Sequence, residues 1–211
     1  NIGAEFVAKQ APADGYTLLV AGAPHAINMS LFKNLRYDLA RDLAPVTNIA
    51  AFPSLIAIHP SVPVKSIKEL IAYAKANPGK MNFASAGTGS GIHLAAEYFK
   101  VQAGIEMTHV PYKGSGPALQ DLVGGHVAIY FSSMPPALGL IKEGKVRALA
   151  VTGPKRSDIM PELPTVAEAG DLPGFEAVLH YGIVAPAGTP TAIVNKLNIA
   201  LRAAVMSDEL K

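Results

Sequence analysis

The clearest folding signal in the chain is Met81-Asn82-Phe83-Ala84-Ser85-Ala86-Gly87-Thr88-Gly89-Ser90-Gly91, followed by the apolar pattern of residues 92–103. Residues 81–84 predict a short strand, the glycines and serines after them predict a loop, and residues 92–103 predict a helix. The same order of strand, loop and helix recurs over residues 108–123. This alternation predicts an α/β fold with mainly parallel strands.

Similar signals lie on both sides of this segment. Residues 16–21 form an apolar run typical of a buried, parallel strand, and Gly22-Ala23-Pro24-His25 is expected to form a loop at its carboxyl end. Ligands usually bind at such loops in α/β sheets. The apolar segments 43–58 and 175–184 predict further strands.

Helix starts and turns are also marked. Ser66 and Thr189 each precede a helical pattern, which makes both of them N-cap candidates. The chain contains 19 glycines and 17 prolines, and they cluster at the edges of segments. This clustering indicates many short elements joined by defined turns.

Composition excludes several classes of protein. The chain has 211 residues, of which 50% are hydrophobic and 16% are charged, so it can bury a core and is not disordered through excess charge. The net charge is +2 and the longest basic run is Lys155-Arg156, so no nucleic-acid partner is expected. The absence of cysteine excludes disulfides, thiol nucleophiles and Cys-ligated zinc or iron–sulfur sites. No apolar run approaches the roughly twenty residues of a membrane span.

The first residues suggest a processed or truncated chain. Asn1-Ile2-Gly3-Ala4 has no initiator methionine, and no signal peptide precedes the apolar pattern that begins at Ile2.

Three loops of small residues, 22–25, 85–91 and 112–117, are the candidate binding elements. Each follows a predicted strand and precedes a helix, whose N-terminal N–H groups and partial positive charge suit a carboxylate or a phosphate. The loop 85–91 does not match the GxGxxG nucleotide pattern, because position 92 is Ile. An ordinary turn with an N-cap is the alternative for each loop alone. Together the three loops favour a pocket for a small anion.

Signals for catalysis are poor. The six histidines show no HxxxH or HExxH spacing, and Ser90 lacks the register of a G-x-S-x-G nucleophile elbow. His93 is expected to pack or to form hydrogen bonds in the first turn of its helix. We therefore expect a binding protein with no metal site and no cofactor, and an enzyme acting on a small anionic substrate is the alternative.

The sequence resembles one family along its whole length. The motifs that carry the resemblance are Pro12-Ala13-Asp14-Gly15-Tyr16-Thr17-Leu18-Leu19, Asp42-Leu43-Ala44-Pro45-Val46-Thr47, Ala84-Ser85-Ala86-Gly87-Thr88-Gly89-Ser90, His109-Val110-Pro111-Tyr112-Lys113-Gly114, Gly144-Lys145-Val146-Arg147-Ala148-Leu149-Ala150-Val151-Thr152, Leu163-Pro164-Thr165-Val166-Ala167-Glu168-Ala169-Gly170 and Ala185-Pro186-Ala187-Gly188-Thr189-Pro190. This set is similar to the Bug family, the TctC-like substrate-binding proteins of tripartite tricarboxylate transporters.

The resemblance implies the type II periplasmic-binding-protein fold, in which two α/β domains are joined by two crossing strands. Domain 1 is then expected to comprise residues 1–54 and 178–211, and domain 2 residues 55–177. The N-terminal part of domain 1 is expected to be absent from this chain. The two crossing strands are expected within 43–58 and 175–184.

The resemblance also implies a function and its partners. A periplasmic protein of this family captures a small carboxylate between its domains, as a monomer, for uptake or sensing by contact with membrane transporter subunits. In the family, backbone amides, hydroxyls and ordered waters hold the carboxylate. The implied ligand-binding residues here are Ala23, Pro24, His25, Ser85, Gly87, Thr88, Gly89, Ser90, His93, Tyr112, Lys113, Gly114, Ser115, Gly116, Pro117 and Ala118.

Two further positions depart from the family pattern. Ser132 stands where many members have an aspartate, and His180 stands near a position where a tryptophan is common. Both are included among the ligand-binding candidates. For His180 two roles are open, contact with a second carboxylate or packing alone.

Overall fold

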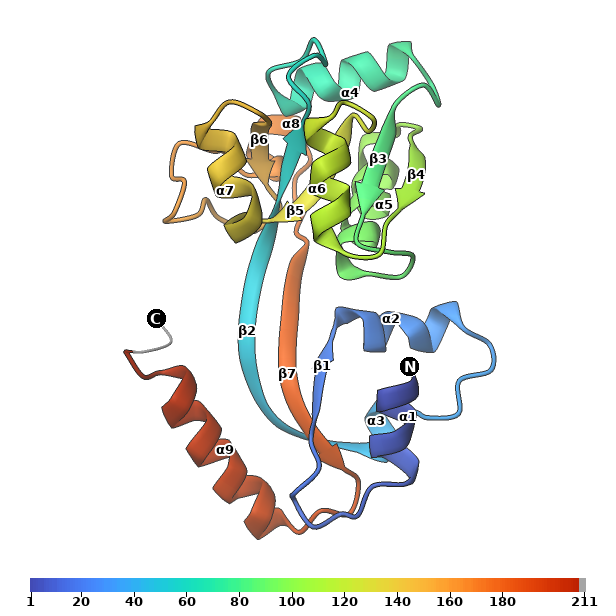
Figure 1. Ribbon diagram of the computed structural model, residues 1–211, viewed down its shortest axis with the longest axis vertical. Coiled ribbons are helices and arrows are strands. Elements are labelled where there is room, and N and C mark those ends of the chain that lie inside the picture. Colours follow the sequence, from blue (N-terminus) through green and yellow to red (C-terminus); the bar gives the residue numbers. More distant parts are fainter. Residues whose placement is uncertain (209–211) are drawn as a thin grey trace. The chain divides into compact units, whose positions relative to one another are not determined.

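A computed structural model describes residues 1–208 of the chain (Figure 1). The chain divides into two compact units. Unit 1 comprises Asn1–Ala51 and the residues from Leu179 onward, and unit 2 comprises Phe52–Val178. Both passages of the chain between the units lie at strands, β2 (Leu43–Ile58) and β7 (Val178–Pro186).

The sheet of unit 2 is built on β2, β3 (Asn82–Ser85), β4 (Thr108–Pro111), β5 (Ile129–Ser133) and β6 (Arg147–Val151). β3 pairs in parallel with both β4 and β5, whereas β2 pairs antiparallel with both β5 and β6. Strands β3, β4, β5 and β6 therefore run in one direction, as expected, whereas the long strand β2 runs against them and makes the sheet mixed.

The helices of unit 2 are α4 (Ile67–Ala76), α5 (Gly91–Ala103), α6 (Ser115–Val123), α7 (Met134–Lys142) and α8 (Val166–Gly170). The chain steps from β3 to β4 through α5, and then back across β3 to β5 through α6. Because such crossovers are right-handed, the change of direction places α5 and α6 on opposite faces of the sheet (Figure 1). Both helices nevertheless start at the same edge, the carboxyl ends of the parallel strands.

The core of unit 2 is aromatic and aliphatic. Phe83, Phe99, Tyr130 and Phe131 are fully buried between the sheet and its helices. The rings of Phe99 and Phe131 pack with centroids 5.8 Å apart. A tightly packed core of this kind holds the strand ends, and hence the loops that follow them, in fixed positions.

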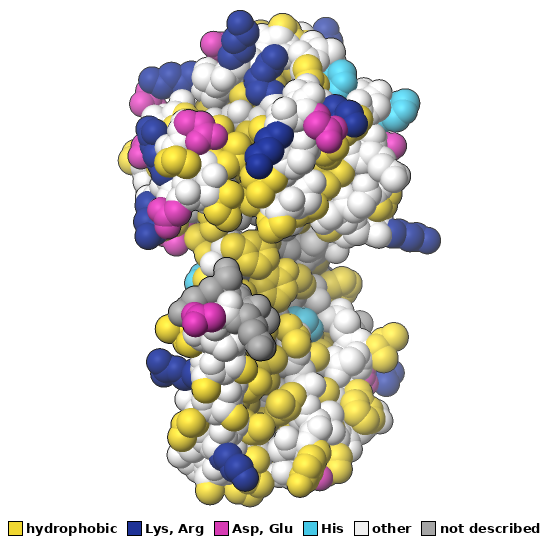
Figure 2. Space-filling model, turned by 60° about the vertical axis from the view of Figure 1, so that its left-hand side comes forward, with side chains coloured by type: hydrophobic (Ala, Val, Ile, Leu, Met, Phe, Trp, Pro, Cys, Tyr) yellow, Lys and Arg dark blue, Asp and Glu magenta, His cyan; other side chains and the backbone are white. Residues whose placement is uncertain are grey.

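Unit 1 contains α1 (Ile2–Lys9), β1 (Leu19–Gly22), α2 (Ala23–Leu31), α3 (Leu39–Asp42), β7, the first half of β2 and α9 (Thr191–Val205). β7 lies between β1 and β2 in the strand order. No residue of α9 is buried. The face of unit 1 in the lower half of Figure 2 carries few charged side chains among many hydrophobic ones.

Three expectations about local structure are corrected. The run 16–21 gives β1, which is only partly buried and pairs antiparallel with β7, because an apolar run does not encode the direction of its neighbour. No loop follows β1, since α2 begins directly at Ala23. In the same way α6 begins at Ser115, so the loop after β4 is confined to residues 112–114.

None of the helices within residues 1–208 combines the length and the apolar character that a membrane-spanning helix needs.

Candidate functional site

The loop after β3, residues 86–90, is shaped by the side chain of Ser85. Ser85 is fully buried, and its Oγ accepts a hydrogen bond from the Gly87 N–H at 3.1 Å. The same Oγ lies 2.7 Å from Nε2 of His109 and 3.1 Å from the Gly87 carbonyl oxygen. Gly87 has a φ of +131°, and a Cβ there would lie 3.3 Å from the carbonyl oxygen of Tyr112. This turn therefore favours glycine at position 87. The buried Ser85 side chain holds the loop through its hydrogen bonds to the Gly87 backbone.

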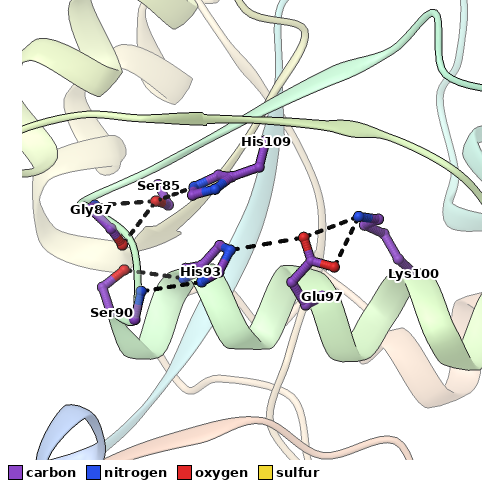
Figure 3. A network of polar contacts seen from close by, with 8 residues as sticks. Ser85, Gly87, Ser90, His93, Glu97, Lys100 and His109 are labelled. Atoms are coloured by element: carbon purple, nitrogen blue, oxygen red, sulfur yellow. Dashed lines mark hydrogen bonds and ion pairs between the residues drawn. The ribbon is translucent and has the colours of Figure 1, made fainter. Parts of the chain in front are cut away.

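Two stacked histidines lie beside this loop (Figure 3). The rings of His93 on α5 and His109 on β4 have centroids 4.0 Å apart, and the ring of Phe83 stacks on His109 at 5.0 Å. Nδ1 of His93 accepts a hydrogen bond from the Gly89 N–H at 3.3 Å, which assigns the proton of the neutral ring to Nε2. Burial is the main cause that lowers the pKa of both histidines, so both are neutral at pH 7.

A charged pair continues this network along α5. Nε2 of His93 lies 3.8 Å from Oε1 of Glu97, and Nζ of Lys100 donates to both Glu97 oxygens at 3.0 and 2.9 Å. The ammonium of Lys100 also lies 5.5 Å from the centroid of the Phe83 ring. The charges of Glu97 and Lys100 thus compensate each other within the network.

The loop after β4 is tied to both of its neighbours by Tyr112. The Tyr112 hydroxyl donates to Oδ2 of Asp121 on α6 at 2.5 Å, and its backbone N–H donates to the Ser85 carbonyl at 3.1 Å. Burial, followed by the contact with Asp121, raises the pKa of Tyr112 to about 12. Tyr112 is therefore a neutral anchor of the loop.

The first turns of α5 and α6 supply the polar groups that remain for a ligand. The Ser90 Oγ caps α5 by accepting from the His93 N–H at 3.2 Å, whereas Gly114, with a φ of +111°, starts α6 without a side-chain cap. The N–H groups of Ser115 and Gly116 have no partner within the helix. The strand ends below the two helices pair directly, Ser85 with Pro111. Two helix N-termini at adjacent strand ends form a region suited to an anion.

The other predicted residues of unit 2 surround this region. Thr88, Lys113, Gly116 and Pro117 are exposed, and Ala118 is buried in α6. Ser132 lies on β5, next to β3, and its buried hydroxyl donates to the Ser133 carbonyl at 2.8 Å. The Ser132 side chain thus already has a partner.

The predicted residues of unit 1 lie around the start of α2. Ala23 and His180 line one hollow of about 380 Å³, and His180 is exposed on β7. Pro24 occupies the first turn of α2, and Nδ1 of His25 accepts a hydrogen bond from the Gly22 N–H at 3.1 Å. Burial lowers the pKa of His25.

Sequence reasoning missed the roles of His109 and Asp121, which hold the two loops. The pairing of Phe83 with His109 puts His109 on the face of the sheet that Ser85 shares, so the strand register would have revealed this contact. The described residues contain no group of three or more His, Asp or Glu side chains that could hold a metal ion.

Comparison with known protein families shows which family the chain belongs to. The family model of the tripartite tricarboxylate transporter family receptor, TctC, matches residues 1–210. The chain belongs to the TctC family. The protein BugT of Bordetella pertussis is 40% identical over 208 residues, which cover 98% of this chain and 63% of BugT. The chain spans about three fifths of the length of the curated relatives it matches.

Several solved structures share the fold over almost the whole chain. One is R. palustris Rpa4515 with adipate, 42% identical with a TM-score of 0.89 over 99% of this chain and 70% of its own. Another is MatC (Rpa3494) from Rhodopseudomonas palustris with bound malate, 34% identical with a TM-score of 0.87 over 99% of this chain and 71% of its own. The type II periplasmic-binding-protein fold expected from the sequence is confirmed by this likeness.

Proposed function

We propose that the protein is a periplasmic receptor that captures a small carboxylate between two domains and presents it to a tripartite tricarboxylate transporter for uptake or sensing. Units 1 and 2 correspond in this proposal to the two domains expected from the sequence. The proposal has the protein act as a monomer that contacts the membrane subunits transiently. Membership of the TctC family and the acids bound by Rpa4515 and MatC support it.

The single observation that carries the proposal is the pair of helix N-termini at adjacent strand ends. The side chains of Ser85, Ser90 and Tyr112 are engaged in holding the loops, which leaves backbone N–H groups as the main donors. Backbone donors and helix dipoles recognise the charge of a carboxylate without adding a reactive group. The proposed contacts in unit 2 are Thr88 to Gly91 and Lys113 to Gly116, and in unit 1 they are Ala23 and His180.

An enzyme on the same fold is the second candidate, because one contact resembles an activated nucleophile. The Ser85 Oγ lies 2.7 Å from Nε2 of His109, within the range of a serine–histidine pair. Ser85 is fully buried, however, and its Oγ also contacts both polar backbone groups of Gly87. A nucleophile must reach its substrate, so this geometry favours binding over catalysis.

The decisive experiment removes one backbone donor. Ser115 is the first residue of α6, where proline is tolerated, and Gly114 before it has the extended ψ of 176° that proline requires. Ser115→Pro deletes the N–H, while Ser115→Ala deletes only the hydroxyl and serves as the matched control. A hydrogen bond to a charged group contributes about 1.5–3 kcal/mol, so we expect the Kd of Ser115→Pro to rise roughly ten- to a hundredfold.

Isothermal titration with adipate, malate and other mono-, di- and tricarboxylates provides the measurement. The proposal requires at least one acid to bind the native chain and to bind Ser115→Pro more weakly than Ser115→Ala. Equal affinities in the two variants, or no binding of any acid, contradict it. Mass spectrometry of the titrated acid tests the second candidate. If the acid is converted to a product, the protein is an enzyme and the receptor function is refuted.

A further inference from the structure

An apolar cavity of about 480 Å³ lies in unit 2, outside the residues that the sequence singles out. Its polar side chains are those of Ser133 and Ser157, and no charged residue lines it. Its apolar lining comes from Phe52, Pro53, Met134, Pro135, Pro136 and Ile159.

The helix that borders this cavity differs from α5 and α6 in the groups it offers. α7 begins with Met134, Pro135 and Pro136, and the Ser133 side chain makes no capping hydrogen bond. Two of the first three residues of α7 therefore lack an N–H, which weakens this N-terminus as an anion site. Below it, the hydroxyl of Ser132 is already bonded to the Ser133 carbonyl. This part of unit 2 thus presents hydrocarbon in place of hydrogen-bond donors.

Strand pairing places the cavity at the same edge of the sheet as the carboxylate site. β5 pairs in parallel with β3, so Ser133 and the start of α7 lie at the same edge as the loop 86–90. Ser54 on β2 pairs with Ser133, which brings Pro53 and Phe52 to that edge, and the segment after β6 adds Ile159. β5 and β3 are neighbouring strands about 5 Å apart, so the side of the cavity formed by Ser133 and Met134 is the side next to the loop 86–90.

We propose that this cavity receives the apolar body of the carboxylate ligand, and that the natural ligand is therefore an organic acid carrying a hydrocarbon chain or an aryl group. This inference rests on the proposed function and specifies its substrate class. The carboxylate lies at the N-termini of α5 and α6, while the hydrocarbon lies against Met134, Pro135 and Ile159. A small, heavily hydroxylated acid leaves the cavity empty and gains no affinity from it.

Affinity across matched acids tests the proposal. Succinate, 2-methylsuccinate, 2-butylsuccinate and phenylsuccinate carry the same two carboxylates at the same spacing and differ only in their hydrocarbon branch, so the series adds apolar surface without moving a charge into the cavity. We expect affinity measured by isothermal titration to rise by about fourfold for each methylene that is buried, and phenylsuccinate to bind more tightly than succinate. If succinate binds as tightly as all the others, the apolar subsite is refuted while the proposed function stands. If none of the acids binds, both fail.

Two variants test whether the gain in affinity with added hydrocarbon arises at the cavity. Ile159 is 64% exposed, so Ile159→Asn removes apolar surface from the cavity with little risk to folding, and Met134→Ser removes a deeper wall. Val101→Asn on α5, at a residue that is 75% exposed and outside the cavity, is the matched control. Thermal melting of each variant verifies its fold. We expect the gain in affinity from succinate to 2-butylsuccinate to shrink at least twofold in Ile159→Asn or Met134→Ser and to persist in Val101→Asn. A gain unchanged in both cavity variants overturns the assignment.

Discussion

We expect the stacked pair of His93 and His109 to make unit 2 sensitive to acid. Burial lowers the pKa of both rings below the ordinary value of 6.5, so the folded chain binds fewer protons than the unfolded chain. Stability is then fully present above about pH 6.5 and is lost as the pH falls through that value, because the unfolded histidines become protonated first. We expect the free energy of unfolding in urea to fall between about pH 7.5 and about pH 5.5, and His109→Gln to reduce that fall.

His126→Gln is the control for this experiment, because His126 is exposed in a turn. The pKa of His25 in unit 1 is also lowered by burial, so part of the acid sensitivity should remain in His109→Gln. An equal fall in the native chain and in His109→Gln would show that the histidine pair is not its source.

Among the elements, the contact between β2, β6 and the entry to β7 depends on one hydroxyl. The buried Thr152 Oγ1 accepts from the Ser54 N–H at 2.8 Å, and it lies 2.7 Å from the Ala177 carbonyl oxygen. Thr152→Val keeps the shape but leaves the buried Ser54 N–H without its partner, so we expect a loss of about 1–3 kcal/mol in the free energy of urea unfolding. Thr108→Val, at an exposed threonine, should change it by less than about 0.5 kcal/mol. Equal effects would contradict this role for Thr152.

The sequence predicts most elements but not their directions or their finer contacts. Ser66 caps α4 as predicted, accepting from the Glu69 N–H at 3.2 Å, because an N-cap depends on residues close in the chain. Thr189 is not a cap, since its hydroxyl donates to the Pro186 carbonyl at 2.8 Å. The sequence likewise predicts the loop after β3, but residues 23–25 and 115–117, also expected in loops, belong to the first turns of α2 and α6. It does not predict that the Ser85 side chain is engaged internally, because the partner His109 is far along the chain and only strand pairing brings it near.

At the scale of the whole molecule, the two units differ in the core that each contains. The largest fully buried side chains, among them Phe83, Phe99, Tyr130 and Phe131, all lie in unit 2. Among the described residues, unit 1 has fewer buried hydrophobic side chains than unit 2, and none of them lies on α9. Because hydrophobic stabilisation grows with the apolar area buried, unit 2 is expected to be the more stable of the two.

This difference provides a test of capture between two domains. We expect calorimetric unfolding of the ligand-free chain to show two transitions, the lower from unit 1. A ligand at 100 times its Kd stabilises the state that binds it by about 2.7 kcal/mol. An acid held by both units must raise the lower transition and bring the two together, whereas an acid held by unit 2 alone raises only the upper one. Ser115→Pro, which binds weakly in the proposed mechanism, should keep both transitions apart at the same acid concentration. A lower transition that does not move with ligand would confine binding to unit 2 and refute enclosure.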